Sequence, residues 1–341
     1  MRIAVIGAGL IGTRRAETAV ACGDHVTIVA DVDRDRAGIC AARVHARATD
    51  DWRVAVTSAD VDVVVVATPN KFAQAIATTA ASAGKHVLCE KPLGRNAAEA
   101  GTIVEAAERA GITLKTGFNH RHHPAIRRAH ELISSGTIGE AFCFRCVYGH
   151  GGRPGYDKEW RGDPEIAGGG ELLDQGVHVL DLARWFLGEF VTASAIVTTW
   201  YWDVAPLEDN AFATLQTASG QVASFHTSWT QWKNRFLLEI IARDGLVTID
   251  GLGGSYGVER LQVARRRPES GPPDVVTEEF VGDDESWREE WIEFTSAIRA
   301  GRSPLGNGRD GLEALRLVDT LYLAARERRP VTVLHTQCET K

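Results

Sequence analysis

The sequence has 341 residues, of which 44% are hydrophobic and 24% charged, so it is long enough for two globular domains with cores of their own. The net charge of −7, from 38 basic and 45 acidic side chains, argues against a general nucleic-acid-binding surface. The six cysteines are scattered and no apolar run is long enough to cross a membrane, so we expect a cytoplasmic protein that is neither membrane-bound nor built on disulfides.

The first third of the chain alternates short apolar or β-branched runs with segments of helical spacing. Strands are expected at residues 2–6, 26–30, 61–67, 86–89 and 113–116. Helices are expected between them at residues 10–22, 33–42, 72–83 and 97–110. Nearly continuous apolar strands that alternate with helices predict a parallel sheet covered on both faces.

The pattern changes after Gly117. Two amphipathic helices are expected at residues 125–134 and 171–187, with a loop rich in glycine and charge between them at residues 149–170. Alternating segments follow at residues 192–202, 211–217, 221–229, 236–242, 246–249, 258–264 and 275–281, and closing helices at 285–299 and 312–327. The chain is therefore expected to be α/β, with a second domain built on an open, mostly antiparallel sheet.

A glycine-rich turn lies directly between the first expected strand and the first expected helix. It reads Gly7-Ala8-Gly9-Leu10-Ile11-Gly12, which is G-x-G-x-x-G. In a dinucleotide-binding turn the first glycine makes the tight bend, the second lets a pyrophosphate approach the backbone, and the third lets the helix pack on the strand. The helix N-terminus then faces the phosphates. We therefore predict a Rossmann domain over residues 1–118 and a substrate and oligomerisation domain over residues 119–341.

The nature of the dinucleotide is predicted from the end of the second strand. Asp31 stands about twenty residues after the glycine turn, where a carboxylate can accept hydrogen bonds from the adenosine ribose. The same carboxylate repels a 2′-phosphate, which favours NAD. Arg34 keeps NADP open, because a guanidinium at that position can bind the 2′-phosphate.

Three further stretches carry a resemblance to a known family. Thr68-Pro69-Asn70 follows the third strand, Glu90-Lys91-Pro92 follows the fourth, and the segment 168–181 contains Asp174-x-Gly-x-His178. Together they resemble the glucose–fructose oxidoreductase/inositol dehydrogenase (Gfo/Idh/MocA) family over essentially the whole chain. The resemblance implies a sugar or cyclitol oxidoreductase, with the active-site lysine at Lys91, a cis Lys91–Pro92 bond, and an open sheet used for dimer or tetramer contacts.

The same residues can be interpreted chemically. Lys91 follows a parallel strand, so it is expected at the sheet edge where ligands bind, and its ammonium can stabilise a developing alkoxide. Asp174 and His178 are four residues apart and would share one face of a helix. His178 can take the hydroxyl proton, and Asp174 can orient the imidazole or bind a substrate hydroxyl. These three residues are the predicted catalytic set.

Other residues are expected to bind the cofactor or the substrate. Asn119 follows the fifth strand and is a candidate for either ligand, and Tyr156, Trp160 and Arg161 offer aromatic and cationic groups before the catalytic helix. The remaining expected cofactor contacts are Gly7, Gly9, Leu10, Ile11, Gly12, Asp31, Arg34, Thr68, Pro69, Asn70, Glu90 and Lys91. The arginines of this loop favour an anionic substrate, such as a phosphorylated or nucleotide-linked sugar.

No metal is expected, because the cluster His120-Arg121-His122-His123 has no neighbouring cysteine or carboxylate in the sequence. The expected function is an NAD(P)-dependent dehydrogenase or reductase that moves a hydride between nicotinamide and a secondary alcohol or ketone of a sugar, sugar derivative or cyclitol. Two alternatives stay open. One is an aldose–aldose or redox-neutral enzyme with tightly held NAD(P), and the other is a non-catalytic NAD sensor.

Overall fold

The computed structural model describes residues 1–334, which form two compact units. The first unit comprises residues 1–119, 165–168 and 286–315, and among the described residues the second comprises 120–164, 169–285 and 316–334. The sequence-based division after residue 118 differs from this at residue 119 and in the segments 165–168 and 286–315. Helical spacing shows that a helix has an apolar face, but it does not show which sheet that face packs against. Residues 335–341, at the end of the expected second domain, lie outside the described part of the chain.

The first unit is a six-stranded parallel sheet of order β3-β2-β1-β4-β5-β6. Its strands are β1 (Arg2–Ile6), β2 (His25–Ala30), β3 (Arg47–Thr49), β4 (Val63–Val66), β5 (His86–Cys89) and β6 (Leu114–Thr116). Its helices are α1 (Leu10–Ala21), α2 (Arg34–Arg43), α3 (Trp52–Thr57), α4 (Asn70–Ser82), α5 (Ala97–Ala110) and α9 (Ser286–Ala300). The order is that of a dinucleotide-binding fold, as expected.

Two elements of this sheet were not expected from the sequence. Strand β3 and helix α3 occupy a stretch that carried no predicted element. The strand has only three residues, Arg-Ala-Thr, and pairs with one neighbour at the sheet edge, so it needs no apolar alternation. The helix has six residues and begins after Asp51, whose carboxylate accepts a hydrogen bond from the backbone N–H of Arg53.

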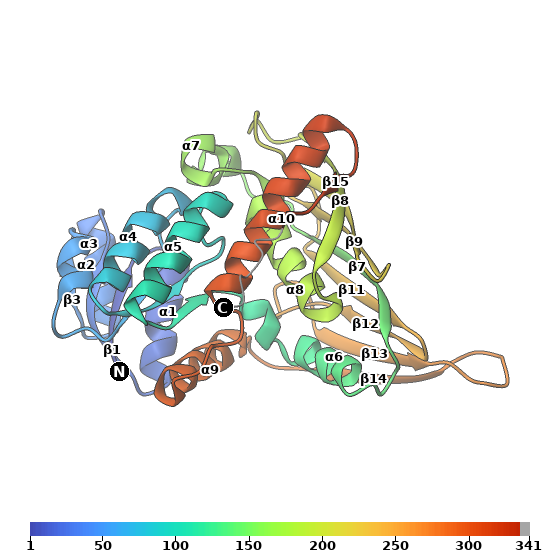
Figure 1. The fold of residues 1–341 in the computed structure, drawn as a ribbon. Coiled ribbons are helices and arrows are strands. Elements are labelled where there is room, and N and C mark those ends of the chain that lie inside the picture. Colours follow the sequence, from blue (N-terminus) through green and yellow to red (C-terminus); the bar gives the residue numbers. More distant parts are fainter. Residues whose placement is uncertain (335–341) are drawn as a thin grey trace. The chain divides into compact units, whose positions relative to one another are not determined.

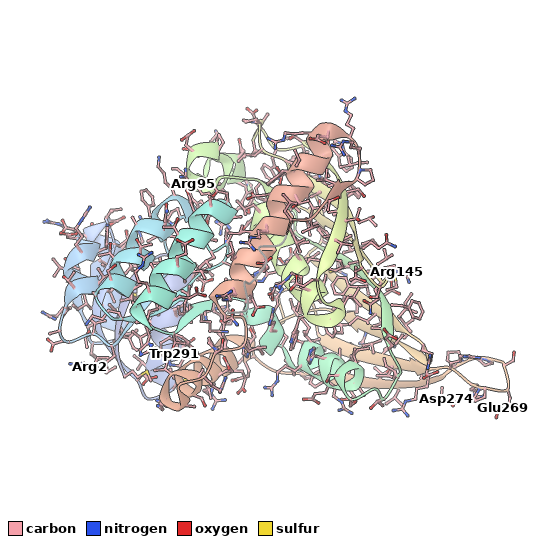
Figure 2. All side chains as sticks on the ribbon, in the orientation of Figure 1. Arg2, Arg95, Arg145, Glu269, Asp274 and Trp291 are labelled. Carbon is pink, nitrogen blue, oxygen red and sulfur yellow. The ribbon has the colours of Figure 1, made fainter. Side chains whose placement is uncertain are left out.

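The second unit is a nine-stranded sheet of order β14-β13-β12-β11-β7-β10-β9-β8-β15. Its strands are β7 (Ala141–Gly149), β8 (Phe190–Thr198), β9 (Asn210–Thr217), β10 (Val222–Ser228), β11 (Arg235–Ala242), β12 (Gly245–Asp250), β13 (Glu259–Arg265), β14 (Asp274–Phe280) and β15 (Val331–Thr332). All neighbours are antiparallel except β7 and β10, which confirms the mostly antiparallel sheet. The hairpin between β13 and β14 carries Glu269 and extends beyond the sheet (Figure 2).

Helices α6 (Pro124–Ser134) and α8 (Val177–Leu187) pack on one face of the nine-stranded sheet (Figure 1). The shorter helical turns are η1 (Asn119–His122), η2 (Tyr156–Lys158), η3 (Trp160–Gly162), α7 (Pro164–Ala167) and η4 (Leu172–Gly176). Helix α10 (Gly308–Glu327) continues the chain from the first unit into the second. Within residues 1–334 no helix is both long enough and apolar enough to cross a membrane.

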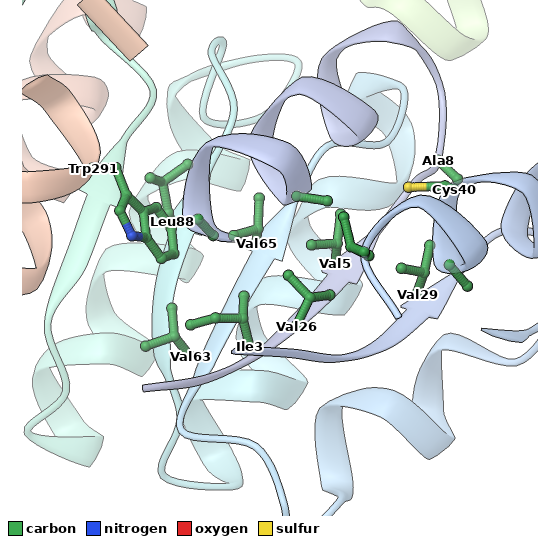
Figure 3. Packing of buried hydrophobic residues seen from close by; sticks show 14 of the residues in the cluster. Ile3, Val5, Ala8, Val26, Val29, Cys40, Val63, Val65, Leu88 and Trp291 are labelled. Carbon is green, nitrogen blue, oxygen red and sulfur yellow. The ribbon is translucent and has the colours of Figure 1, made fainter. Parts of the chain in front are cut away.

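The core of the first unit explains why α9 belongs to it. Val5, Val29 and Val65 of three parallel strands form a cluster with Trp291 and Phe294 of α9, all fully buried (Figure 3). The Trp291 indole Nε1 donates a hydrogen bond of 2.8 Å to Asp24 Oδ2. A segment nearly 300 residues along the chain thus completes the hydrophobic core of the parallel sheet.

We expect Trp291→Ala to destabilise the first unit by about 3–5 kcal/mol, because it leaves a large cavity and removes the indole partner of Asp24. The matched control is Trp232→Ala, since Trp232 is 68% exposed and its removal should change the free energy of unfolding by no more than about 0.5 kcal/mol. Chemical unfolding followed by circular dichroism measures both. Equal midpoints for the two variants would contradict this account of the core.

Candidate active site

The glycine turn between β1 and α1 is shaped by two close backbone approaches and one open position. A Cβ at Gly7, whose φ is +94°, would lie 2.4 Å from the carbonyl oxygen of Ala67, and a Cβ at Gly12 would lie 1.7 Å from that of Gly7. A Cβ at Gly9 would meet nothing within 4 Å. Gly7 and Gly12 are therefore required by packing. Gly9 borders open space at the N-terminus of α1, where a pyrophosphate can approach the backbone.

This turn lies where the strand order reverses, between β1 and β4. Ligands of doubly wound sheets bind at such a switch point. Thr68, Pro69 and Asn70 follow β4 on the same edge, and the buried Thr68 Oγ1 has no hydrogen-bond partner among residues 1–334. Such a hydroxyl is suited to a bound dinucleotide. Asn70 Nδ2 donates a hydrogen bond of 2.8 Å to the carbonyl oxygen of Ala167, and the expected cofactor contact by Asn70 stays a prediction.

Asp31 at the end of β2 reaches the glycine turn. Its Oδ2 accepts a hydrogen bond of 2.7 Å from the backbone N–H of Ala8, and its Oδ1 accepts one of 2.9 Å from Asp33. The carboxylate is thereby fixed beside the turn of residues 7–12, the glycine cradle, and keeps lone pairs for ribose hydroxyls. Arg34 is engaged elsewhere, since its Nε donates 2.6 Å to Asp50 Oδ2. Leu10 is exposed and Ile11 half-buried at the start of α1.

The loop after β5 contains the cis bond between Lys91 and Pro92, as the resemblance implied. Lys91 is half-buried. The Glu90 carboxylate accepts a hydrogen bond of 2.6 Å from Arg15 Nε, and the expected cofactor contact by Glu90 stays a prediction. Burial raises the pKa of Glu90, and the charge of Arg15 opposes the rise. Glu90 therefore fixes the loop that carries Lys91.

Asn119, expected to contact cofactor or substrate, follows β6 in the first unit and is 7% exposed. Its Nδ2 donates a hydrogen bond of 3.0 Å to Ser286 Oγ at the start of α9. The side-chain amide nitrogen thus has a structural bond, and a ligand contact by Asn119 stays a prediction.

In the second unit Asp174 and His178 lie on a helix that changes type between them. Residues 171–187 were expected to form one α-helix, but η4 is a π-turn and α8 begins only at Val177. A π-turn contains one extra residue, which apolar periodicity does not reveal. Asp174 lies within this turn and His178, 4% exposed, in the first turn of α8. Single-turn π-segments occur frequently at functional sites.

Two of the expected substrate residues surround Asp174. Arg161 Nε donates a hydrogen bond of 3.2 Å to Asp174 Oδ2. Burial alone would lower the pKa of Arg161, but the negative charge of Asp174 raises it, so the pair is ionic. Burial, reinforced by Asp174, raises the pKa of Tyr156, so that phenol stays protonated and can donate to a substrate oxygen. Trp160 is half-buried, and its ring lies 4.5 Å from the Arg161 guanidinium.

Three residues of this region were not predicted. The Tyr256 phenol interacts with Tyr148, and burial raises the pKa of Tyr256 to about 12. His120 stacks on His178. Tyr256 lies in the segment Gly251-Leu-Gly-Gly-Ser-Tyr-Gly257, and a single tyrosine in a glycine-rich loop after a strand is a signal that could have identified it. The sequence indicated His120 only as a candidate metal ligand, which it did not favour.

Residues 1–334 contain no group of three or more histidine, cysteine, aspartate or glutamate side chains placed to hold a metal ion. Of the two tryptophans that follow β10, Trp229 is fully buried and Trp232 is 68% exposed.

Comparisons with known proteins agree with this geometry. The model of the oxidoreductase family with an NAD-binding Rossmann fold matches residues 1–118, and that of the GFO/IDH/MocA C-terminal domain matches residues 126–248. D-apiose dehydrogenase of Paraburkholderia graminis is 30% identical over 303 residues, which cover 85% of this chain and 77% of the relative. The chain belongs to the GFO/IDH/MocA oxidoreductase family.

Two further matches place the chain within this family. Levoglucosan dehydrogenase of Pseudarthrobacter phenanthrenivorans is 36% identical over 196 residues, which cover 57% of this chain but only 50% of the relative. A solved structure of a levoglucosan dehydrogenase in complex with NADH superposes with a TM-score of 0.90 at 26% identity, over 98% of this chain and all of that one. The fold of that structure therefore extends over nearly the whole of this chain, and its NAD-binding part corresponds to residues 1–118.

We expect Gly9→Ala to weaken NADH binding at least about tenfold without changing the melting temperature, because the added methyl enters open space where the backbone meets phosphate. Gly12→Ala should lower the melting temperature itself, since its Cβ meets backbone at 1.7 Å. Gly38→Ala on α2, which also has nothing within 4 Å, is the matched control and should change neither property adversely. Calorimetric titration with NADH and thermal unfolding measure the two effects. Wild-type affinity in Gly9→Ala would contradict the proposed cradle.

Proposed function

We propose that this chain is an NAD-dependent dehydrogenase that oxidises a secondary alcohol of an uncharged sugar or cyclitol, and that reduces the ketone in the reverse direction. The observation that carries the proposal is the group formed by Asp174, Arg161 and Tyr156 in the second unit, with His178 in the first turn of the following helix, in a chain whose first unit has the glycine cradle. A set of carboxylate, guanidinium, phenol and imidazole side chains suits a ligand with many hydroxyls.

His178 is the proposed general base. It takes the hydroxyl proton onto its imidazole as the C–O bond becomes a carbonyl. Lys91 donates a hydrogen bond to the same oxygen and stabilises the negative charge that develops there. Asp174, held by Arg161, accepts a hydrogen bond from a second substrate hydroxyl. When bound, the nicotinamide supplies the hydride acceptor, so alcohol and NAD⁺ give ketone, NADH and a proton.

The charges around Asp174 support an uncharged substrate and not the phosphorylated or nucleotide-linked one favoured by the sequence. Arg153 donates two hydrogen bonds of 2.8 Å to Glu159, and Arg161 is paired with Asp174. Both guanidinium groups are thus neutralised by carboxylates. A phosphate would have to displace one of these pairs before it could bind.

Asp31 supports NAD as the cofactor. Its carboxylate is fixed beside the cradle, and a 2′-phosphate there would be repelled. Arg34, the candidate ligand for that phosphate, is paired with Asp50. Binding of NADP through Arg34 would require this side chain to leave Asp50 and to pair with the 2′-phosphate.

The proposal is tested by incubating the protein with NAD or NADP and a panel of cyclitols, free sugars, anhydrosugars and sugar phosphates, with reduced nicotinamide followed by absorbance. We expect turnover with NAD and uncharged compounds. Lys91→Ala and His178→Ala should each lower kcat by at least about a thousandfold and still bind NADH, because each loses a group used only in the reaction.

The control is Lys233→Ala, a surface lysine that should leave kcat unchanged. Activity of either catalytic variant within about tenfold of the parent would refute its assignment. Turnover only with sugar phosphates would refute the uncharged substrate.

We also propose that two or more copies assemble through the outer face of the nine-stranded sheet, opposite α6 and α8. A groove of about 1140 Å³ runs over this face, and it is lined by Arg145 of β7 (Figure 2), Phe212 of β9 and His226 of β10. The Phe212 and His226 rings stack at 4.0 Å. Ile196 of β8 is 68% exposed at the same face. An apolar surface of this kind on a sheet usually has a partner.

We expect Ile196→Arg to shift the protein toward monomer, because a second copy would bury the guanidinium. Val54→Arg is the matched control, since Val54 is exposed on α3 of the first unit. Size-exclusion chromatography with light scattering gives the mass of each. A monomeric parent protein would contradict the assembly.

Cys40, Cys89, Cys143 and Cys146 carry free thiols, and Cys338 lies outside the described part of the chain. Because free thiols persist in reducing compartments, we propose that the protein works in the cytoplasm.

A further inference from the structure

The turn η1 places a second imidazole directly on the proposed base. The rings of His120 and His178 lie 3.8 Å apart between centroids and only 14° from parallel. His120 is 5% exposed and His178 4%. Two flat rings at this separation are in van der Waals contact over one whole face. His120 therefore covers one face of the proposed general base.

The ring of His120 is itself held on its edges. Tyr148 of β7 and Phe236 of β11 meet it edge-on, with centroids at 5.2 and 6.1 Å, and His123 meets it edge-on at 5.7 Å. His123 in turn is hydrogen-bonded through Nδ1 to Glu259 Oε2 at 3.0 Å. Glu259 Oε1 accepts a further bond of 2.7 Å from the backbone N–H of Ala125. The ring of His120 is thus held in place by its neighbours and gives His178 a fixed surface to pack against.

A buried ion pair ties the same turn to the same helix. Arg121 donates two hydrogen bonds, of 2.7 and 2.6 Å, to the carboxylate of Asp181. Asp181 is three residues after His178, so the two lie on neighbouring positions of one face of α8. Both charges are almost fully buried, and separating the two partners of a buried ion pair is strongly destabilising. The turn and the helix are therefore joined at two points, one electrostatic and one by ring stacking.

We propose that His120 is a positioning residue for His178, which it holds in the orientation needed to accept the substrate proton. The terminal torsion of a histidine is broad, so an imidazole on a helix needs its surroundings to fix it. A stacked ring restricts rotation about that torsion, and it contacts a face of the imidazole and not the edge that carries the nitrogens. This inference rests on the proposed role of His178 as general base.

The kinetic test compares His120→Ala, which removes the stacked ring, with His120→Phe, which keeps a flat ring. Because misplacement of a catalytic group by about 1 Å can cost about a hundredfold, we expect His120→Ala to lower kcat by about 10–100-fold with KM within about threefold of the parent. His120→Phe should stay within about fivefold of the parent in kcat, since it retains the stack.

The matched control is His130→Ala. His130 of α6 stacks on Trp185 of α8 at 3.8 Å and 8°, so its removal deletes a similar stack on the same helix, away from His178. We expect kcat within about threefold of the parent. A general loss of helix packing would lower the activity of His130→Ala as much as that of His120→Ala, and this would overturn the positioning role.

A second measurement needs neither cofactor nor substrate. In nuclear magnetic resonance spectra, with signals assigned through His178→Asn, the ring C–H resonances of His178 should be shifted upfield in the parent and in His120→Phe by the neighbouring ring. They should move toward the values of a solvent-exposed histidine in His120→Ala and stay unchanged in His130→Ala. Unshifted resonances in the parent, or identical resonances in His120→Ala, would overturn the stack.

The outcomes separate this inference from the function on which it rests. If His178→Asn retains kcat within about tenfold of the parent, the proposed base is wrong whatever His120 does. If His178→Asn is inactive and His120→Ala keeps the parent's kcat within about threefold, the base stands and the positioning role is refuted.

Discussion

The first unit depends on a guanidinium that is entirely removed from water. Arg15 of α1 donates to Glu90 Oε1 at 2.6 Å and to Glu290 Oε2 at 2.5 Å, and the Trp287 ring covers it at 4.4 Å. Burial alone would lower the pKa of Arg15, but the two carboxylates raise it, so the side chain remains charged. Such a charge costs several kcal/mol to bury and is tolerated only with its partners in place. Lys115, 3.5 Å from Glu290, supplies the second positive charge that balances the two carboxylates.

This network sets the geometry of the cofactor-binding half of the chain. Arg15 is one turn into the helix that begins at the glycine cradle, Glu90 directly precedes Lys91, and Glu290 lies beside Trp291 in α9. The cradle, the lysine loop and the late helix are therefore held together by the same charges. The second unit also contains a buried ion pair, in which Arg121 and Asp181 fix the turn η1 against α8.

Much of the fold followed from local patterns in the sequence. The parallel sheet was predictable because its strands are almost wholly apolar. The glycine cradle was predictable because three glycines at this spacing, between a strand and a helix, are typical of dinucleotide-binding turns. The packing of α9 on the parallel sheet was not predictable, because the local sequence around Glu290 and Trp291 does not indicate which sheet the helix contacts. The roles of His120 and Arg121 were also missed. Their partners His178 and Asp181 lie some sixty residues later, and only the folded chain brings them together.

The π-turn before α8 also determines what changes of length the chain can accept. A π-turn is an α-helix with one residue added, and each residue of an α-helix turns the chain by about 100°. Deleting one residue between Leu172 and Gly176 would therefore restore a regular helix, and if the residue lost lies after Asp174 it would also shorten the spacing of Asp174 and His178 from four residues to three. Insertions and deletions are usually harmless in loops, but here a single one would change the spacing of the carboxylate and the imidazole while leaving the apolar pattern of the helix readable. An alignment that places a gap in this segment would misassign one of the two residues without any visible sign of error.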